Sequence, residues 1–234
     1  MNHSKYRHEY KHEINLADYY ALRQRLSAAM APDPNAAEDG TYHVRSLYFD
    51  NADDKALREK IYGLPDREKF RLRIYSGNDA LIRLEKKSKS CGLCSKQSAE
   101  LTRQQAQSII SGGLGAIAEN SWMLESGDGL LAEFYAKISF QGLRPRTLVD
   151  YQREAYIYPH GNVRVTFDFD IRTGIYSTGF FDGDAPTLSV CRPGTLLLEV
   201  KYDRFLPDII RDIIQTNTRR TQAFSKYAAC RIYG

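Results

Sequence analysis

Residues 69–73 read Lys-Phe-Arg-Leu-Arg, and residues 83–87 read Arg-Leu-Glu-Lys-Lys. Successive side chains of a β-strand point to opposite faces, so each stretch places a row of charged residues on one face, with Phe70, Leu72, Leu84 and Lys86 on the other. A Ser-Gly-Asn-Asp run at 76–79 lies between them and predicts the turn of a hairpin. Pairing across this hairpin would bring the charged residues of both strands onto one face of a sheet.

Three further stretches repeat the alternation of charged and uncharged residues. A single strand of this kind is most simply explained as a solvated sheet face, but that explanation must hold separately for each strand and weakens with each one. We therefore expect one sheet face with a dense field of Arg, Lys and Glu, which would line a tunnel if the sheet closes. The three stretches are Arg7-x-Glu9-x-Lys11-x-Glu13, Arg164-x-Thr166-x-Asp168-x-Asp170 and Glu199-x-Lys201.

The predicted elements are mostly strands in hairpins, with helices inserted between them. This order favours an α+β fold with an antiparallel sheet and helices packed outside it, because a parallel sheet would need strict alternation of strand and helix. A length of 234 residues fits a single domain over 1–234. We expect strands at 5–13, 41–50, 67–76, 80–89, 94–100, 145–158, 162–173 and 195–203, one or two short strands within 174–195, and helices at 16–30, 53–62, 103–111, 128–140, 207–216 and 221–230.

Composition narrows the class of protein. The chain has 33 basic and 29 acidic residues, a net charge of +4, and its basic residues lie in the strand patterns among glutamates. This distribution argues against a general nucleic-acid binder, whose basic residues would gather on an outer face. The polar start and the lack of an apolar run approaching the roughly 20 residues of a membrane span predict a soluble, cytoplasmic protein without membrane insertion of its own.

Two smaller patterns leave alternatives open. Cys91-x-x-Cys94 has the spacing of a metal or redox motif, but Cys191 and Cys230 supply no second pair. Unremarkable reduced thiols at a hairpin tip are the simpler explanation, and a redox or metal role is the other. The Asp168-x-Asp170 pair could add a second metal ligand or form salt bridges with a neighbouring arginine.

Beyond alternation, a series of short motifs runs from the first strand to the last helix. Taken in order, these motifs resemble the catalytic domain of the vacuolar transporter chaperone (VTC) polyphosphate polymerases, within the triphosphate tunnel metalloenzyme, or CYTH-like, superfamily. The motifs are Tyr10-Lys11 after Arg7-x-Glu9, Leu47-Tyr48-Phe49-Asp50, Arg71-x-Arg73, Glu85-x-Lys87, Asp150-Tyr151-Gln152-Arg153, Val163-Arg164, Leu198-Glu199-Val200-Lys201-Tyr202 with Leu206-Pro207, and Phe224-Ser225-Lys226-Tyr227.

The resemblance implies a closed eight-stranded antiparallel β-barrel whose tunnel is lined by charge. It also implies that Glu199 is the principal ligand of a catalytic Mn²⁺ or Mg²⁺. Glu9 and Glu85, which alternation places on the same face, are further metal-ligand candidates, and Lys201 is a further catalytic candidate. The positions carried over as catalytic, phosphate-binding residues are Lys11, Arg71, Arg73, Lys87, Arg153, Arg164 and Lys226.

These residue types suit phosphoryl transfer, in which a protein mainly holds the phosphate chain in line and neutralises its charge. Arginine grips phosphate oxygens with a planar fork, whereas lysine acts as a point charge. The resemblance implies transfer of the γ-phosphate of a nucleoside triphosphate to inorganic polyphosphate. We expect no nucleic-acid partner, and a membrane protein is a candidate partner. The alternatives are a metal-dependent tri- or polyphosphate hydrolase and a non-catalytic polyphosphate or nucleotide sensor.

Overall fold

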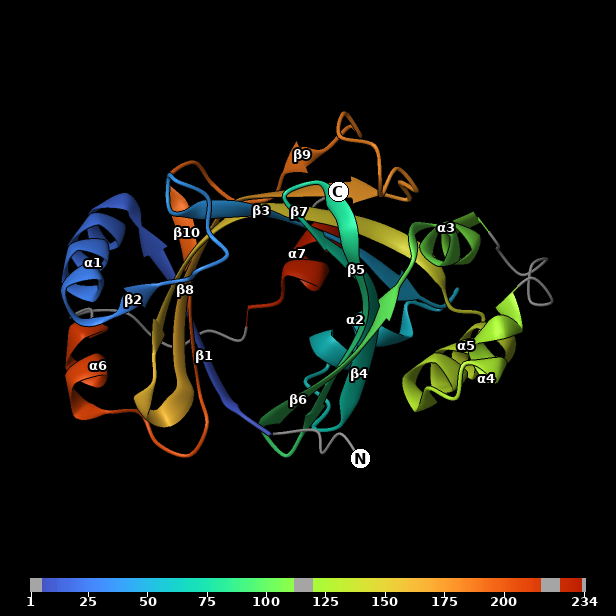
Figure 1. Cartoon of the computed structure of the whole chain (residues 1–234), viewed down its shortest axis with the longest axis horizontal. Helices are drawn as coiled ribbons and strands as arrows, with labels where there is room; N and C mark the ends of the chain where they lie inside the picture. Colours follow the sequence, from blue (N-terminus) through green and yellow to red (C-terminus); the bar gives the residue numbers. More distant parts are fainter. Residues whose placement is uncertain (1–5, 112–119, 216–223, 233–234) are drawn as a thin grey trace.

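An antiparallel sheet forms the body of the structure, a computed structural model that describes residues 6–111, 120–215 and 224–232. Eight strands follow one another across it in the order β1-β10-β8-β7-β3-β4-β5-β6, and the short strands β2 and β9 pair with β7 and β8 (Figure 1). The strands are β1 His8–Asn15, β2 Ala31–Pro32, β3 Thr41–Asp50, β4 Arg67–Tyr75, β5 Asn78–Ser90, β6 Leu93–Leu101, β7 Arg144–Tyr158, β8 Val163–Ile175, β9 Leu188–Ser189 and β10 Thr195–Tyr202.

Helices connect the hairpins, and local sequence sets where they begin. The Asn15 side chain accepts a hydrogen bond from the Asp18 amide, and the Asp18 carboxylate accepts one from the Asn15 amide, which forms a capping box at the start of α1. At the start of α5, the Asp128 carboxylate accepts hydrogen bonds from the Leu130 and Leu131 amides. Gly142 ends this helix at φ 66°, a conformation that favours glycine. The helices are α1 Leu16–Ala29, α2 Lys55–Ile61, α3 Arg103–Ser111, α4 Trp122–Glu125, α5 Gly129–Gln141, the 3₁₀ turn η3 His160–Asn162, α6 Asp208–Ile213 and α7 Lys226–Ile232.

The sheet curls, and two apolar cores lie on its convex side. Figure 1 shows α1 and α6 flanking one end of the curled sheet and α3, α4 and α5 flanking the other. Phe134 of α5 is fully buried against Phe49 and Phe70 in one core, and Leu22 and Leu26 of α1 are buried in the other. These helices confirm the predicted packing outside an antiparallel sheet.

Helix α7 departs from that prediction, because it lies on the concave face. Its Tyr227 stacks on Tyr48 with ring centroids 5.0 Å apart, and Tyr48 in turn accepts a hydrogen bond from Arg71 on the charged face. The buried side chains of Tyr227 and Cys230 fill one end of the concavity against Val149 and Leu197. The expectation that all helices pack outside the sheet is therefore wrong for α7, whose apolar residues are buried in a third core on the concave side.

A fully closed barrel is also not what the structure shows. The edge strands β1 and β6 meet only at an isolated bridge, in which the Arg7 amide donates to the Cys94 carbonyl at 3.0 Å and the Cys94 amide donates back at 3.3 Å. Among residues 6–111, 120–215 and 224–232, no ladder continues from this bridge. The sheet is a curled, open one whose edges touch.

Most predicted elements lie within a few residues of those observed. The segment 174–195 contains one short strand, β9, and the predicted helix at 221–230 corresponds to α7, while residues 221–223 lie outside the described residues. The alternation of β8 breaks where Asp170 adopts φ 47° and the register with β7 shifts. Asp170 is exposed as a result, so its predicted place on the charged face is wrong. In the described part of the chain, no helix is both long and apolar enough to span a membrane.

Candidate active site

Strand register brings the predicted charged residues onto the concave face. In the β4–β5 hairpin, Arg71 lies opposite Glu85 and Arg73 opposite Arg83. The other wall is built in the same way. Its cross-strand rows, β1 to β10 to β8, are Lys11–Glu199–Thr166 and Glu9–Lys201–Arg164.

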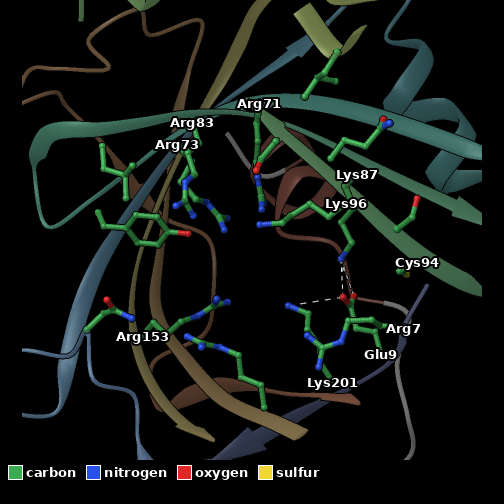
Figure 2. Close-up of a pocket in the computed structure, with 18 of the residues that line it drawn as sticks. Arg7, Glu9, Arg71, Arg73, Arg83, Lys87, Cys94, Lys96, Arg153 and Lys201 are labelled. Carbon is green, nitrogen blue, oxygen red and sulfur yellow. Dashed lines mark hydrogen bonds and ion pairs between the residues drawn. The ribbon is translucent and has the colours of Figure 1, made fainter. Parts of the chain in front are cut away.

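These strands surround a cavity of about 1220 Å³. Figure 2 shows the side chains of Arg71, Arg73, Lys96, Arg153 and Lys201 reaching from different strands toward one central space. Of the predicted site residues, six basic side chains and one carboxylate line the cavity. They are Glu9, Arg71, Arg73, Lys87, Arg153, Arg164 and Lys201.

The first ion-pair cluster joins Glu199 and Glu9. Lys11 Nζ lies 3.1 Å from Glu199 Oε2 and 3.2 Å from Glu9 Oε1, so it bridges the two carboxylates. Lys87 Nζ donates to both Glu9 oxygens at 2.9 and 2.6 Å, and Lys201 pairs with Glu199.

Both carboxylates of this cluster are held ionised. Burial raises the pKa of Glu199, but the charges of Lys201 and Lys11 outweigh it and hold the pKa well below its ordinary value. Burial and the nearby Glu199 charge raise the pKa of Glu9, and three lysines overcome both effects and lower it. Burial lowers the pKa of Lys201 to about 8 despite the opposing effect of Glu199.

The second cluster surrounds Glu85, which is almost fully buried. Arg71 donates from Nε and Nη2 to Glu85 Oε2 at 2.9 and 2.6 Å, and Lys96 Nζ reaches the other oxygen at 3.0 Å. Burial raises the pKa of Glu85, but Arg71 and Arg73 hold it well below its ordinary value. Glu85 therefore fixes the orientation of the two arginines that were expected to grip phosphate.

Asp168 anchors the third cluster. Its two oxygens accept from Arg153 Nε and Nη2 at 2.5 and 2.8 Å, and Lys226 of α7 donates to the same carboxylate. Burial raises the pKa of Asp168, yet Arg153 and Lys226 lower it to about 2. Of the two alternatives for Asp168, the salt bridge is the one that the structure shows.

Arg164 is held apart from these clusters, at a different part of the cavity wall. Its Nη2 pairs with Asp33 and donates to the Tyr42 hydroxyl at 2.8 Å. Asp33 also accepts from the amide and the side chain of Asn35. The sequence did not predict Asp33 as a site residue, because the surrounding Pro-Asp-Pro-Asn stretch indicated only the end of the preceding helix.

Other lining residues were also missed as site candidates. Lys96 and Ser98 alternate along β6 as the predicted residues do along β5, so the signal was present in the sequence. The hydroxyls of Tyr48 and Tyr151 accept hydrogen bonds from Arg71 and Arg73, at 2.7 and 3.0 Å, and carry no pattern that distinguishes them from core tyrosines. All four cysteines are free thiols, and Cys94 lines the cavity.

Comparison with known families decides the assignment of the chain. A family model for the VTC domain matches residues 6–232, nearly the whole sequence. The chain belongs to the VTC domain family. The resemblance inferred from the motifs is thereby confirmed. Among proteins of curated function, none matches this VTC domain.

Solved structures share the fold at low sequence identity. A putative adenylyl cyclase from Hippeastrum, described as having a dominant triphosphatase activity, has 15% identity and a TM-score of 0.55, with 96% of the VTC domain chain and 95% of the other covered. A putative adenylate cyclase from Bacillus halodurans has 14% identity and a TM-score of 0.50, with 85% and 81% covered. At this level of identity, these neighbours show that the VTC domain shares their fold.

The carboxylates of this VTC domain fit a divalent cation only in part. Among the described residues, no group of three His, Cys, Asp or Glu side chains gathers as a ready ligand cage. Glu9 and Glu199, which Lys11 bridges, form a pair of hard oxygen donors beside the cavity. Two carboxylates suit Mg²⁺ or Mn²⁺ when phosphate oxygens and water complete the coordination shell. The donor set therefore fits a metal that arrives with a phosphate ligand.

Proposed function

We propose that this VTC domain is a metal-dependent phosphotransferase of the polyphosphate polymerase type. It transfers the γ-phosphate of a nucleoside triphosphate to the end of a polyphosphate chain and releases the nucleoside diphosphate. The observation that carries the proposal is the convergence of basic side chains from both walls on one cavity of about 1220 Å³. Several of these cations share a carboxylate, as Arg71 and Arg73 share Glu85, and such a density of cations suits a ligand with a charge on every unit.

In this proposal, the basic residues hold two phosphate groups in line for displacement. Glu85 already orients the guanidinium groups of Arg71 and Arg73, so these side chains would lose little conformational entropy when phosphate binds. Arg153, fixed by Asp168, offers a similar group from the opposite wall. Lys87 and Lys201 add point charges that neutralise the charge developing on the transferred phosphoryl group and the leaving diphosphate.

Glu199 and Glu9 are the residues proposed to hold Mn²⁺ or Mg²⁺. When bound, the cation would polarise phosphate oxygens and neutralise their charge. The lysines now paired with these carboxylates can turn to the incoming phosphates, since each is a single flexible donor. Glu85 remains a predicted third ligand, although its oxygens contact Arg71 and Lys96.

A hydrolase is the second candidate, because the same cavity could direct water instead of a phosphate chain at the terminal phosphate. The triphosphatase activity described for the Hippeastrum neighbour favours considering it. The polymerase and the hydrolase differ only in the molecule that accepts the phosphoryl group, so the residues that line the cavity do not distinguish them. A sensor that binds polyphosphate or a nucleotide without catalysing a reaction is the third candidate.

Three further expectations from the sequence remain predictions: a single domain over 1–234, a cytoplasmic location and a membrane-protein partner.

One incubation separates these three functions. The protein is mixed with ATP and Mn²⁺, and the products are resolved as long phosphate chains, free phosphate or neither. We expect long chains and ADP, with formation abolished in Glu199→Gln and retained in the exposed control Asp208→Asn on α6, whose side chain is 80% exposed. Free phosphate without chains would replace the polymerase by the hydrolase, and no product with retained binding would leave the sensor.

A further inference from the structure

Two arginines lie next to one exposed tyrosine, near the C-terminal end of α7. Arg146 is close to the start of β7, Arg231 belongs to the last turn of α7, and Tyr176 directly follows β8. The centre of the Tyr176 ring is 5.7 Å from Cζ of Arg146 and 5.2 Å from Cζ of Arg231. One aromatic side chain therefore brings two guanidinium groups together, and none of these three residues lines the charged cavity.

Both arginines are buried. Arg146 is 6% exposed, and the side chain of Arg231 is 9% exposed. A guanidinium group stays protonated, so its burial removes a full charge from water, which is costly unless ion pairs and hydrogen bonds compensate it. The partners of each arginine therefore decide whether the protein itself compensates the two charges.

The protein compensates them only in part. Arg231 Nη2 donates to the two oxygens of Asp54 at 2.8 and 3.0 Å. Arg146 Nη2 donates to the Asn51 carbonyl at 2.7 Å, and in the described part of the chain Arg146 forms no ion pair. Within residues 6–111, 120–215 and 224–232, the buried Nε atoms of both arginines also have no hydrogen-bond partner. Two buried cations thus share one carboxylate and keep two unpaired donors, an arrangement that native structures rarely leave without a ligand.

Two other buried arginines show what the unpaired Nε atoms could bind. Arg45 and Arg153 each donate from Nε and Nη2 to the two oxygens of one aspartate, Asp150 and Asp168 respectively. This edge of a guanidinium group fits two oxygens of a single acidic group. In Arg146 and Arg231, only the Nη2 half of the same edge is used. The missing partner at each Nε is therefore an oxygen of an anion.

Tyr176 covers the pair in an unusual backbone conformation. Its φ of 55° lies in the left-handed region, which residues other than glycine rarely adopt. Its side chain is 62% exposed, so burial of the ring does not account for this conformation. The contacts with the two arginines do, since a cation is attracted to the face of an aromatic ring. A ring so exposed could turn aside with little loss of packing and admit a ligand.

We propose that Arg146 and Arg231 bind a phosphate group beside Tyr176, at a site here called the Tyr176 site. A tetrahedral phosphate can accept from both guanidinium groups at once, whereas the two oxygens of a carboxylate are filled by one of them. The inference goes beyond the proposed function, because the site is separate from the charged cavity. Helix α7 connects the two, since Lys226 at its start pairs with Asp168 of the cavity wall, and a bound phosphate would fix the other end of this helix.

The test is nuclear magnetic resonance of the arginine Nε–H groups in protein with isotopically labelled arginine. Inorganic phosphate is added to the wild type and to Arg71→Ala/Arg73→Ala, which lacks the arginine pair of the cavity. Arg146→Gln and Arg231→Gln assign the two signals, because each variant loses one of them. We expect both signals to move and to reach half-saturation at about 1 mM phosphate or below, equally in the two proteins.

Arg103 is the matched control. Its Cζ lies 4.6 Å from the centre of the Phe181 ring and it pairs with Asp79, but its side chain is 61% exposed. The Arg103 signal should not move with phosphate, and Arg103→Gln should leave the Arg231 signal unchanged. In Arg146→Gln, by contrast, the Arg231 signal should need about tenfold more phosphate to move. If Arg146→Gln does not fold, the Arg146 signal in Arg231→Gln measures the same loss.

The outcomes separate the Tyr176 site from the proposed function. The absence of a saturable shift up to about 10 mM phosphate, or an equal shift with sodium chloride at the same ionic strength, would overturn the Tyr176 site. A shift with inorganic phosphate alone supports a site for free phosphate, and a shift with glycerol phosphate as well supports a site for a phosphoester. Failure of the cavity to bind triphosphate would overturn the proposed function and leave the Tyr176 site in place.

Discussion

The two ends of the concave face are built from the same strands and differ in what fills them. At one end, Val44, Val149 and Leu197 are buried against Tyr227 and Cys230 of α7 in an ordinary apolar core. At the other end, the equivalent alternating positions carry arginine, lysine and glutamate around an open cavity. One end stabilises the fold by excluding water, and the other keeps charge where a ligand can reach it.

Helix α7 shows how closely the two ends are joined. Tyr227 stacks in the apolar end and donates to Asp50 at 2.6 Å, while the preceding residue, Lys226, pairs with Asp168 in the charged end. One turn of helix therefore belongs to both regions. The comparison teaches that substitutions in the apolar end should cost stability, whereas substitutions in the charged end should cost binding or turnover.

The largest expected effect on stability comes from the apolar end. Tyr227→Ala should lower the free energy of unfolding by about 3–5 kcal/mol, because it removes a fully buried ring. Tyr227→Phe should lower it by only about 1 kcal/mol, the contribution of the hydrogen bond to Asp50. Denaturant unfolding of both variants measures these values. A loss below about 1 kcal/mol for Tyr227→Ala would show that α7 is not a core element.

The next effect concerns turnover at the charged end. Glu199→Gln should reduce product formation from ATP and Mn²⁺ by at least about 100-fold, roughly 2.7 kcal/mol of transition-state stabilisation. The fold should persist because Lys11 keeps its contact with Glu9 at 3.2 Å. Steady-state rates and a melting curve check both parts. Unchanged turnover at saturating Mn²⁺ would remove Glu199 from the mechanism and direct attention to Glu9.

Much of the fold and site follows from local sequence. Alternation in the 69–73 and 83–87 stretches predicted the hairpin and the shared charged face, because side-chain direction in a strand depends only on the neighbouring residues. Closure, by contrast, depends on whether β1 and β6 pair, and among the described residues the bridge between Arg7, just before β1, and Cys94 is all that joins them.

The contacts that the sequence did not predict depend on long-range packing. Asp33 meets Arg164 across 131 positions of the chain, and Tyr227 meets Asp50 across 177. Tertiary packing also decides that α7 lies inside the concavity, since its apolar residues could pack on either face of the sheet. The bulge at Asp170 is a local feature, but no glycine marks it in the sequence.

As pH rises past about 7, the free energy of unfolding of the free protein should increase, whereas its affinity for triphosphate should decrease. Burial, with help from nearby lysines and Arg71, lowers the pKa of Lys69 to about 7. Burial raises the pKa of Tyr48, but Arg71, Lys69 and Arg73 lower it to about 7. The unfolded chain, with ordinary values of 10.5 and 10.0, binds more protons above pH 7, so these two groups should make stability rise between pH about 7 and 10.

Bound polyanion favours protonated Lys69 and neutral Tyr48, so triphosphate affinity should fall as pH rises past about 7. Calorimetry in two buffers of different ionisation enthalpy should detect proton uptake on binding. The uptake should shrink in Lys69→Met/Tyr48→Phe. An affinity that is constant or rises from pH about 6 to 9 would contradict the assignment of these groups to the charged end.

The smallest expected effect is a gain in stability when a lysine of the charged end is replaced. Lys69→Met should raise the free energy of unfolding by up to about 1 kcal/mol, because it relieves repulsion from Lys87 and Lys11 and keeps a similar side-chain volume. Denaturant unfolding near neutral pH measures it. A loss of more than about 1 kcal/mol would mean that the charged end stabilises the fold as the apolar end does.

The central claim is that the charged end is a polyanion site organised around Arg71 and Arg73. The most direct measurement is the melting temperature of the wild type and of Arg71→Ala/Arg73→Ala as triphosphate is added. We predict that the wild type melts at a temperature that rises with triphosphate concentration, as mass action requires, and that the double variant loses most of this rise. A full triphosphate shift in the double variant, or none in the wild type, would contradict the account.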